Sequence, residues 1–190
     1  NAISTPSGKI EIFSETVESF NYQDCPGHPT WLEQKEWLGS NLTKQYPLQL
    51  ISGQPHNRLH SQLDNGSESQ NYKILGREPI KIHFQDAQSR GLINGDIVEV
   101  FNKRGKCLAG VIISNEVMKG VVFLPVGAWY DPINDGDFCI HGNPNVLTED
   151  IGTSSLAQGP SAHSTLVEIK KYTKELPEIN VLHKPSIVNK

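Results

Sequence analysis

Short apolar runs that alternate with polar residues constrain the fold of this chain more than any other feature. A period of two is typical of half-buried strands, because successive side chains of a strand point to opposite faces. Residues 102–105 predict a hairpin connection, residues 94–95 predict a turn, and residues 86–90 predict a short helix that Gly91 stops. Strands are expected at 48–51, 80–83, 97–101, 107–113, 121–125 and 165–169. Short strands with tight turns imply a closed barrel or a sandwich.

A dense polar segment, residues 52–65, follows the first of these strands. Gly53 has no side chain and lets the backbone come close to a ligand. Arg58 offers five donors in a planar fork suited to phosphate or to the edge of a heterocycle, and Ser61 and Gln62 add neutral donors and acceptors. A polar heterocycle that carries phosphate would use all of these groups. The alternative is an ordinary solvated loop, which the same composition permits.

Two later segments are open to the same pair of interpretations. Residues 127–132 end a strand with small residues followed by two aromatic rings, which can wall a planar ligand or plug one end of a barrel. The amide of Asn145 can donate to and accept from the edge of a ring, or it can form an Asx-turn. Residue types alone do not choose between these alternatives.

Several kinds of catalytic or metal site are not expected. His56 and His60 have the spacing of a helical metal pair, but Pro55 argues against a helix and no third ligand is near. The aspartic protease signature, the Gly-x-Ser-x-Gly elbow and the glycine-rich nucleotide-binding loops do not occur; residues 135–137 and 64–66 read as ordinary turns.

Composition limits the binding partners and structural sites that this chain can be expected to have. The chain has 190 residues, with 17 basic and 21 acidic side chains and a formal net charge of −4, so nucleic acid is not expected as a partner. Its apolar runs are shorter than the roughly 20 residues that cross a bilayer, so membrane insertion is not expected. Cys25, Cys107 and Cys139 lie far apart and predict neither a disulfide framework nor a zinc or iron-sulfur site.

A series of motifs identifies a family. The run Arg58-Leu59-His60-Ser61-Gln62-Leu63-Asp64 resembles the start of the C-terminal domain of the dimethyl sulfoxide reductase family of molybdenum enzymes, and is most similar to biotin sulfoxide and trimethylamine N-oxide reductases. Further matches follow the family's order: TPSGKIE at 5–11, CPGHP at 25–29, GREP at 76–79, GDIVEVFN at 95–102, GAWYDP at 127–132, HGNPNVLT at 141–148 and DIGTSSLAQG at 150–159.

The resemblance implies a mainly β fold, a double-psi β-barrel with short helices and irregular ends. It implies a C-terminal cofactor-binding domain of a reductase that removes oxygen from an S-oxide or N-oxide and carries molybdenum bis(molybdopterin guanine dinucleotide). The cofactor would be held jointly with domains outside this chain, including the serine that ligates molybdenum. No residue here is therefore expected to be catalytic, and the isolated domain is expected to be inactive.

The resemblance also implies the residues that contact the cofactor. Arg58 would contact pyrophosphate or the pterin carbonyl. Gln62 and Asn145 would form hydrogen bonds with donors and acceptors of the rings, and the backbone of residues 52–55 would add further polar groups. The expected cofactor-binding residues are Ser52, Gly53, Gln54, Pro55, Arg58, His60, Ser61, Gln62, Asn145, Ala162 and His163.

Three segments are expected: an extended lead-in over 1–45, the cofactor-binding barrel over 46–171, and an irregular tail over 172–190. The lead-in residues Trp31, Leu32, Trp37 and Leu38 could contact the rest of the parent reductase or pack on this domain. The alternatives that stay open are a stand-alone barrel module that binds peptides, and a self-processing decarboxylase cut at Gly39-Ser40 or Gly66-Ser67. The sequence decides neither the oxide nor a periplasmic or cytoplasmic location.

Overall fold

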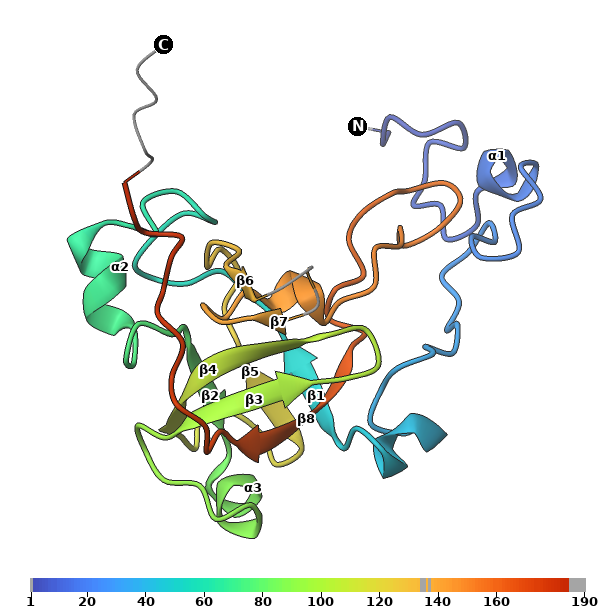
Figure 1. Ribbon diagram of the computed structural model, residues 1–190. Helices are drawn as coiled ribbons and strands as arrows, with labels where there is room; N and C mark the ends of the chain where they lie inside the picture. The colour runs from blue at the N-terminus through green and yellow to red at the C-terminus, as the bar shows by residue number, and fades with distance from the viewer. Residues whose placement is uncertain (1, 134–135, 137, 185–190) are drawn as a thin grey trace. The chain divides into compact units, whose positions relative to one another are not determined.

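A closed ring of strands forms the centre of this chain (Figure 1). The structure is a computed structural model that describes residues 2–133, 136 and 138–184. The ring closes because its last strand, β4, also pairs with its first, β2. In order it contains β2 (Pro79–Ile82), β5 (Val121–Phe123), β1 (Leu48–Ile51), β8 (Leu166–Lys171), β3 (Ile97–Phe101) and β4 (Lys106–Ile113). Two short strands, β7 (Phe138–Cys139) and β6 (Pro132–Ile133), continue the sheet from β4.

The ring contains two parallel pairs among antiparallel neighbours. Strand β1 runs parallel to β5, and β2 runs parallel to β4. The pairings β1–β8, β2–β5, β3–β4 and β3–β8 are antiparallel. Parallel neighbours need long crossover connections, so these pairs join parts of the chain that are far apart in sequence. The arrangement confirms the predicted fold class, a mainly β, double-psi barrel with short helices.

Alternating side chains of the ring strands fill the barrel. Leu48 and Leu50 of β1 are buried, whereas Gln49 between them is not, which is the pattern of a strand with one face in the core. The other strands contribute in the same way. The core includes Leu48, Leu50, Ile80, Ile82, Val98, Val100, Ala109, Val111, Val122, Leu124, Val167 and Ile169.

The predicted strands and helix are present, with shifted ends. Strand β5 ends at Phe123 rather than 125, β4 begins at Lys106, and β8 runs from Leu166 to Lys171. The predicted strand over 80–83 ends at Ile82, because His83 instead caps helix α3 (Phe84–Ser89) and accepts a hydrogen bond from the Gln85 backbone. That helix therefore begins two residues before the predicted start, and Gly91 follows it at a φ of 62°.

The remaining elements were not predicted. They are short: α1 (Glu15–Glu18), α2 (Ser67–Tyr72), the 3₁₀ turns η1 (Asn41–Lys44) and η2 (Pro144–Val146), and strands β6 and β7. Elements of this length show fewer than two full periods of any apolar pattern, which is too few for periodicity to reveal them.

The chain divides into two compact units, each described by itself. One unit contains residues 1–34 and 150–161, and the other contains 35–149 and 162–190. In the first, Ser14 caps α1, the Glu18 carboxylate accepts from the Gly27 backbone at 2.8 Å, and Asp24 accepts from the Ser155 backbone at 2.8 Å. The boundaries predicted from sequence, at 45 and 171, stay a prediction, as does the interface role of the lead-in.

Residues 172–184, the described part of the predicted tail, contain no helix or strand and lie against the barrel. The backbone N–H groups of Asn180 and Val181 donate to one oxygen of Asp131, at 2.7 and 3.1 Å. The guanidinium of Arg77 donates to the Pro177 carbonyl, and Ile179 packs on the outer apolar cluster around Leu108. Residues 185–190 lie outside the described part. Within it, no helix has the length and hydropathy to cross a membrane.

The closed core predicts a steep cost for a truncation inside the ring. Leu50→Ala, at a fully buried side chain, should lower the free energy of unfolding by about 2–5 kcal/mol, because it removes buried methyl groups and leaves a cavity. Ile93→Ala is the matched control, since Ile93 is 64% exposed and should change stability by less than about 0.5 kcal/mol. Denaturant unfolding of both variants measures the difference, and equal losses would contradict this assignment of the core.

Candidate functional site

The predicted polar loop, residues 52–65, leaves the barrel beside the segment 126–129. Strands β1 and β5 are parallel, with Ile51 opposite Phe123, so their carboxyl ends lie at the same end of the ring. The pairing continues past the strands: Leu124 N donates to the Ile51 carbonyl and Val126 N to the Gly53 carbonyl, both at 3.0 Å. Figure 1 draws this loop at the end of the barrel opposite α3. Parallel pairing thus brings together two segments that the sequence analysis selected separately.

Ser52 and His163 meet at the base of the loop. The Ser52 backbone N–H lies 3.2 Å from His163 Nδ1, and the Gln49 side chain donates to the carbonyls of His163 and Thr165. The Ser52 hydroxyl is buried, and no described residue bonds to it. Gly53 follows, where a Cβ would lie 3.0 Å from the Phe123 ring. Two predicted residues far apart in sequence are therefore adjacent.

Gln54 and His60 form a second contact within the loop. The His60 backbone N–H donates to Gln54 Oε1 at 3.1 Å, and Gln54 Nε2 lies 2.6 Å from His60 Nδ1. His60 has a φ of 50°, a left-handed conformation that is uncommon for a residue with a side chain. Both side chains are exposed, so this pair presents an amide and an imidazole to the exterior.

Gly127 permits the close approach of the loop to the 126–129 segment. Its φ is 97°, and a Cβ at this position would lie 1.9 Å from the His60 carbonyl oxygen. Trp129 fixes the same contact, since its indole Nε1 donates to the Ser61 carbonyl and its backbone N–H to Asp64 Oδ2, both at 2.8 Å. Trp129 therefore holds the loop in place through two hydrogen bonds. Its own side chain is half-buried.

Arg58 is buried and belongs to an ionic cluster of five side chains. Its Nη2 lies 3.0 Å from Glu78 Oε1 and donates to the Val126 carbonyl at 3.0 Å, and its Nε donates to the His60 carbonyl at 3.2 Å. Lys73 Nζ lies 2.9 Å from Asp64 Oδ1 and 2.7 Å from Glu78 Oε2. Nη1 of Arg58 has no partner among the described residues. The predicted contact of Arg58 with a ligand stays a prediction, and only Nη1 is left to make it.

His141 completes the ionic cluster of Arg58, Asp64, Lys73, Glu78 and His141. Its Nδ1 lies 3.0 Å from the Trp129 carbonyl, which can only accept, so Nδ1 carries the proton. Burial is the largest effect on this ring and lowers its pKa; Lys73 lowers it further, against the Trp129 carbonyl, Asp64 and Glu78. The imidazole is thus held neutral, and the two cations of the cluster balance its two carboxylates.

The other predicted residues lie at the surface. Gln62 and Asn145 are exposed, and no hydrogen bond of either side chain to a described residue is present. Asn145 lies in η2, where Asn143 supplies the Asx-turn by accepting from the Asn145 backbone at 2.9 Å. Ala162 is half-buried and its carbonyl accepts from the Thr165 hydroxyl at 2.9 Å. Gln62 belongs to the loop, where its backbone N–H donates to the Leu59 carbonyl at 2.9 Å, whereas these contacts do not join Asn145 or Ala162 to the loop.

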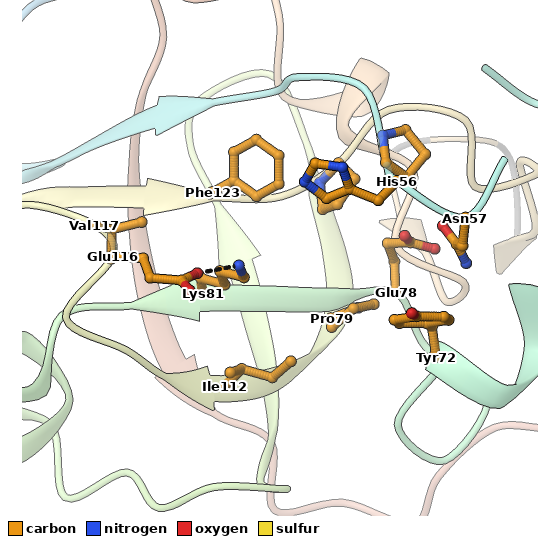
Figure 2. Close-up of a pocket in the computed structure, with 12 residues that line it drawn as sticks. His56, Asn57, Tyr72, Glu78, Pro79, Lys81, Ile112, Glu116, Val117 and Phe123 are labelled. Carbon is orange, nitrogen blue, oxygen red and sulfur yellow. Dashed lines mark hydrogen bonds and ion pairs between the residues drawn. The ribbon is translucent and has the colours of Figure 1, made fainter. Parts of the chain in front are cut away.

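A separate hollow of about 340 Å³ lies on the outside of the barrel between β2, β4, β5 and the loop. Figure 2 shows the Lys81–Glu116 ion pair between Phe123 and Ile112, with Asn57, Glu78 and Tyr72 at the other end. Of the predicted site residues only Pro55 lines it. Within residues 2–133, 136 and 138–184, no group of three or more His, Cys, Asp or Glu side chains could hold a metal ion.

Comparisons with known proteins assign the family. Residues 48–166 match the family model described as "Molydopterin dinucleotide binding domain". This range is more than half of the chain and contains all eleven predicted site residues. The chain belongs to this family. The ligand class of the domain is therefore a molybdopterin dinucleotide, a molybdenum pterin cofactor, and the alternative of a peptide-binding module is not supported.

Relatives of this molybdopterin dinucleotide-binding domain are much longer. A trimethylamine-N-oxide reductase of Haemophilus influenzae is 48% identical over 192 residues, which cover 99% of this chain and 23% of that protein. A dimethyl sulfoxide/trimethylamine N-oxide reductase of Rhodobacter capsulatus is 46% identical, covering 91% and 21%. The chain thus spans less than a quarter of these curated relatives. Acetylene hydratase from Pelobacter acetylenicus shares the fold, with a TM-score of 0.72 at 21% identity, covering 90% of this chain and 24% of that one.

The residues of the domain fit such a cofactor. The loop presents exposed imidazole, amide and hydroxyl groups, which match the donors and acceptors of a pterin or guanine ring. The buried Ser52 hydroxyl and Arg58 Nη1 are polar atoms that no described residue satisfies, and buried groups of this kind normally have a partner. These groups would hold the rings and phosphates of the dinucleotide.

Sequence reasoning missed Lys73, Glu78 and His141, and treated Asp64 as part of a motif and of an ordinary turn. A sequence does not show which charged residues are buried, because burial depends on partners that only the fold brings together. Here Asp64, Lys73 and Glu78 lie at separate positions, and His141 lies more than 60 residues further along the chain. Glu78 and His141 did fall inside the matched GREP and HGNPNVLT motifs, which was the one available signal.

The contact at Gly127 predicts an unusual cost for a single methyl group. Gly127→Ala should lower the free energy of unfolding of the domain by about 2–5 kcal/mol, from backbone strain of about 1–2 and overpacking of about 1–3 kcal/mol. Gly95→Ala separates the two terms, because Gly95 also has a positive φ, 85°, but a Cβ there meets no atom within 4 Å. Thermal unfolding of both variants gives the comparison; equal losses would show that His60 does not obstruct position 127.

His141 predicts a pH dependence of stability. Its pKa lies lower in the fold than in the unfolded chain, where it is about 6.5, so the unfolded chain binds the proton more readily. The stability that neutral His141 contributes is present above pH 6.5 and is lost as pH falls toward the folded pKa. His141→Gln should flatten this part of the profile, measured as unfolding free energy at pH 5 to 8. A His163→Gln variant is the control, and a profile unchanged by His141→Gln would contradict the assignment.

Proposed function

We propose that this domain is the C-terminal part of a longer molybdenum reductase that removes oxygen from an N-oxide or an S-oxide. The printed names of two relatives that align with nearly all of this chain, a trimethylamine-N-oxide reductase and a dimethyl sulfoxide/trimethylamine N-oxide reductase, support the reaction class. Biotin sulfoxide stays a predicted substrate. The single observation that carries the proposal is the family match over residues 48–166. This range includes the polar loop, the segment 126–129 and His163.

The form of the cofactor is part of the proposal. It is bis(molybdopterin guanine dinucleotide), and this domain would hold it together with the rest of the enzyme. Leu59 and Leu63 support a larger assembly, because they are 60% and 73% exposed on the loop itself and give it apolar area to bury. The residues proposed to contact the cofactor are Ser52 to Pro55, Arg58 through Nη1, His60, Ser61, Gln62, Asn145, Ala162 and His163.

The role of this chain in the reaction is to bind and to orient. Buried contacts fix the backbone of the loop, so its exposed amides, hydroxyls and imidazoles are held at defined positions before a ligand arrives. Preorganised donors stabilise a bound group without a cost of rearrangement at the moment of reaction. The domain supplies no base, acid or nucleophile in this proposal, so the chain alone should reduce no oxide.

Analysis of the longer protein that contains this chain tests the proposal. Molybdenum and guanine nucleotide released by acid should occur at two nucleotides per metal, and reduced viologen should drive loss of oxygen from trimethylamine N-oxide or dimethyl sulfoxide. One nucleotide per metal would refute only the bis form. Protein without molybdenum or pterin, when produced in a host that makes the cofactor, would refute the function.

Gln62 gives a clean test of a contact residue, because its exposed side chain bonds to no described residue. Gln62→Ala should change the free energy of unfolding of the cofactor-free protein by less than about 0.5 kcal/mol. It should still weaken retention of the dinucleotide roughly two- to tenfold, the worth of one hydrogen bond of about 0.5–1.5 kcal/mol.

Gln88→Ala is the matched control for Gln62, since Gln88 is an exposed glutamine on α3, at the opposite end of the barrel (Figure 1). Retention is measured as the rate at which pterin fluorescence appears in solution. Equal rates for the two variants would remove Gln62 from the site.

A further inference from the structure

Lys73 is a lysine without access to water. Its side chain is 1% exposed, and its ammonium lies between Asp64 and Glu78, whose side chains are 0% and 3% exposed. Lysine is almost never fully buried unless it is paired, because its ammonium loses its hydration. The position directly follows α2, so a short helix carries this charge into the space between the loop and the barrel. A lysine held in this way has a specific task in the fold.

The two carboxylates that Lys73 bridges belong to different parts of the domain. Asp64 ends the polar loop and accepts from the Trp129 backbone, whereas Glu78 precedes β2 and is anchored by backbone bonds to Gly110 and His141. Arg58, the other cation, approaches the same two residues, at 3.6 Å from Asp64 and 3.0 Å from Glu78. Arg58 and Asp64 are the two ionised residues of the loop. Arg58 pairs with Glu78 directly, and Asp64 is linked to Glu78 through Lys73, so ion pairs join the loop to the barrel at both residues.

We propose that Lys73 is a positioning residue for the cofactor: its ammonium ties the loop to the barrel and thereby fixes the surface formed by Gln54, His60 and Ser61. This inference rests on the proposed function. Without the ammonium, Asp64 and Glu78 face each other with Arg58 alone between them, and one buried negative charge is unbalanced. The loop can relieve that charge only by moving Asp64 toward water, and His60 and Ser61 move with it through their bonds to Arg58 and Trp129.

Three variants of the full reductase test the role of Lys73. Lys73→Met keeps the length and apolar stem of the side chain but removes the charge. The double variant with Asp64→Asn restores the charge balance and keeps an oxygen for the Trp129 backbone. Lys81→Met is the matched control, because Lys81 also pairs with a glutamate, but at an exposed site where side chains of 36% and 71% exposure meet. Cofactor content, rate of cofactor loss and unfolding temperature are measured for each.

The expected result is a loss of cofactor about tenfold faster or more in Lys73→Met, no change in Lys81→Met, and partial recovery in the double variant. Recovery marks coupling between the two charges, which a general loss of packing would not produce. A pH profile adds an independent readout. Lys73 is one cause of the low pKa of His141, which also faces Asp64 and Glu78, so its removal should shift the dependence on His141 to higher pH.

Two results would overturn the inference. One is a Lys73→Met enzyme that holds cofactor as the wild type does; the other is a double variant that loses it as fast as the single variant. If Lys73→Met does not fold, the charge-balanced double variant still decides, since it must then fold and retain the cofactor. Wild-type enzyme free of molybdopterin dinucleotide would instead refute the proposed function.

Discussion

The fixed shape of the polar loop depends on the burial of Asp64. A carboxylate removed from water is strongly unfavourable unless charges and hydrogen bonds surround it. Here Oδ1 meets Lys73 and Arg58, and Oδ2 accepts from the Trp129 backbone. Each partner comes from a different part of the domain, so satisfying one carboxylate fixes the loop, the end of α2 and the segment after β5 together. The positions of the exposed polar groups follow from that constraint.

Strand direction makes this arrangement possible. Because β1 and β5 are parallel, the loop after β1 and the segment after β5 leave the ring at the same end and continue to pair as far as Gly53 and Val126. In an antiparallel pair the two would leave at opposite ends. The close approach then requires a residue without a side chain at Gly127, where a methyl group would strike the His60 carbonyl. Topology brings the segments near each other, and one glycine lets them touch.

The sequence was sufficient for the strands and for the ligand class, and insufficient for the ionic cluster. Leu48, Leu50, Ile80 and Ile82 alternate clearly enough to predict β1 and β2, and the family motifs predicted the barrel. Periodicity contains no information about which strands pair, so the adjacency of Ser52 and His163 could not be derived from it. Arg58 shows the same limit, because its residue type suits a phosphate and a buried carboxylate equally well, and only the fold brings Glu78 beside it.

The distribution of charge in the loop suggests how an anionic dinucleotide would be recognised. Between residues 52 and 65 the ionised side chains, Arg58 and Asp64, are both buried, and the exposed polar groups are amides, hydroxyls and imidazoles. The cluster beneath is balanced, with two cations against two carboxylates and a neutral His141, so it adds little net field at the surface. Selection at this face would then rest on the placement of hydrogen-bonding groups rather than on charge attraction. Such selection is only as precise as the backbone that carries the groups, which explains why the exposed hydrogen-bonding groups of the loop are held in place by buried charges.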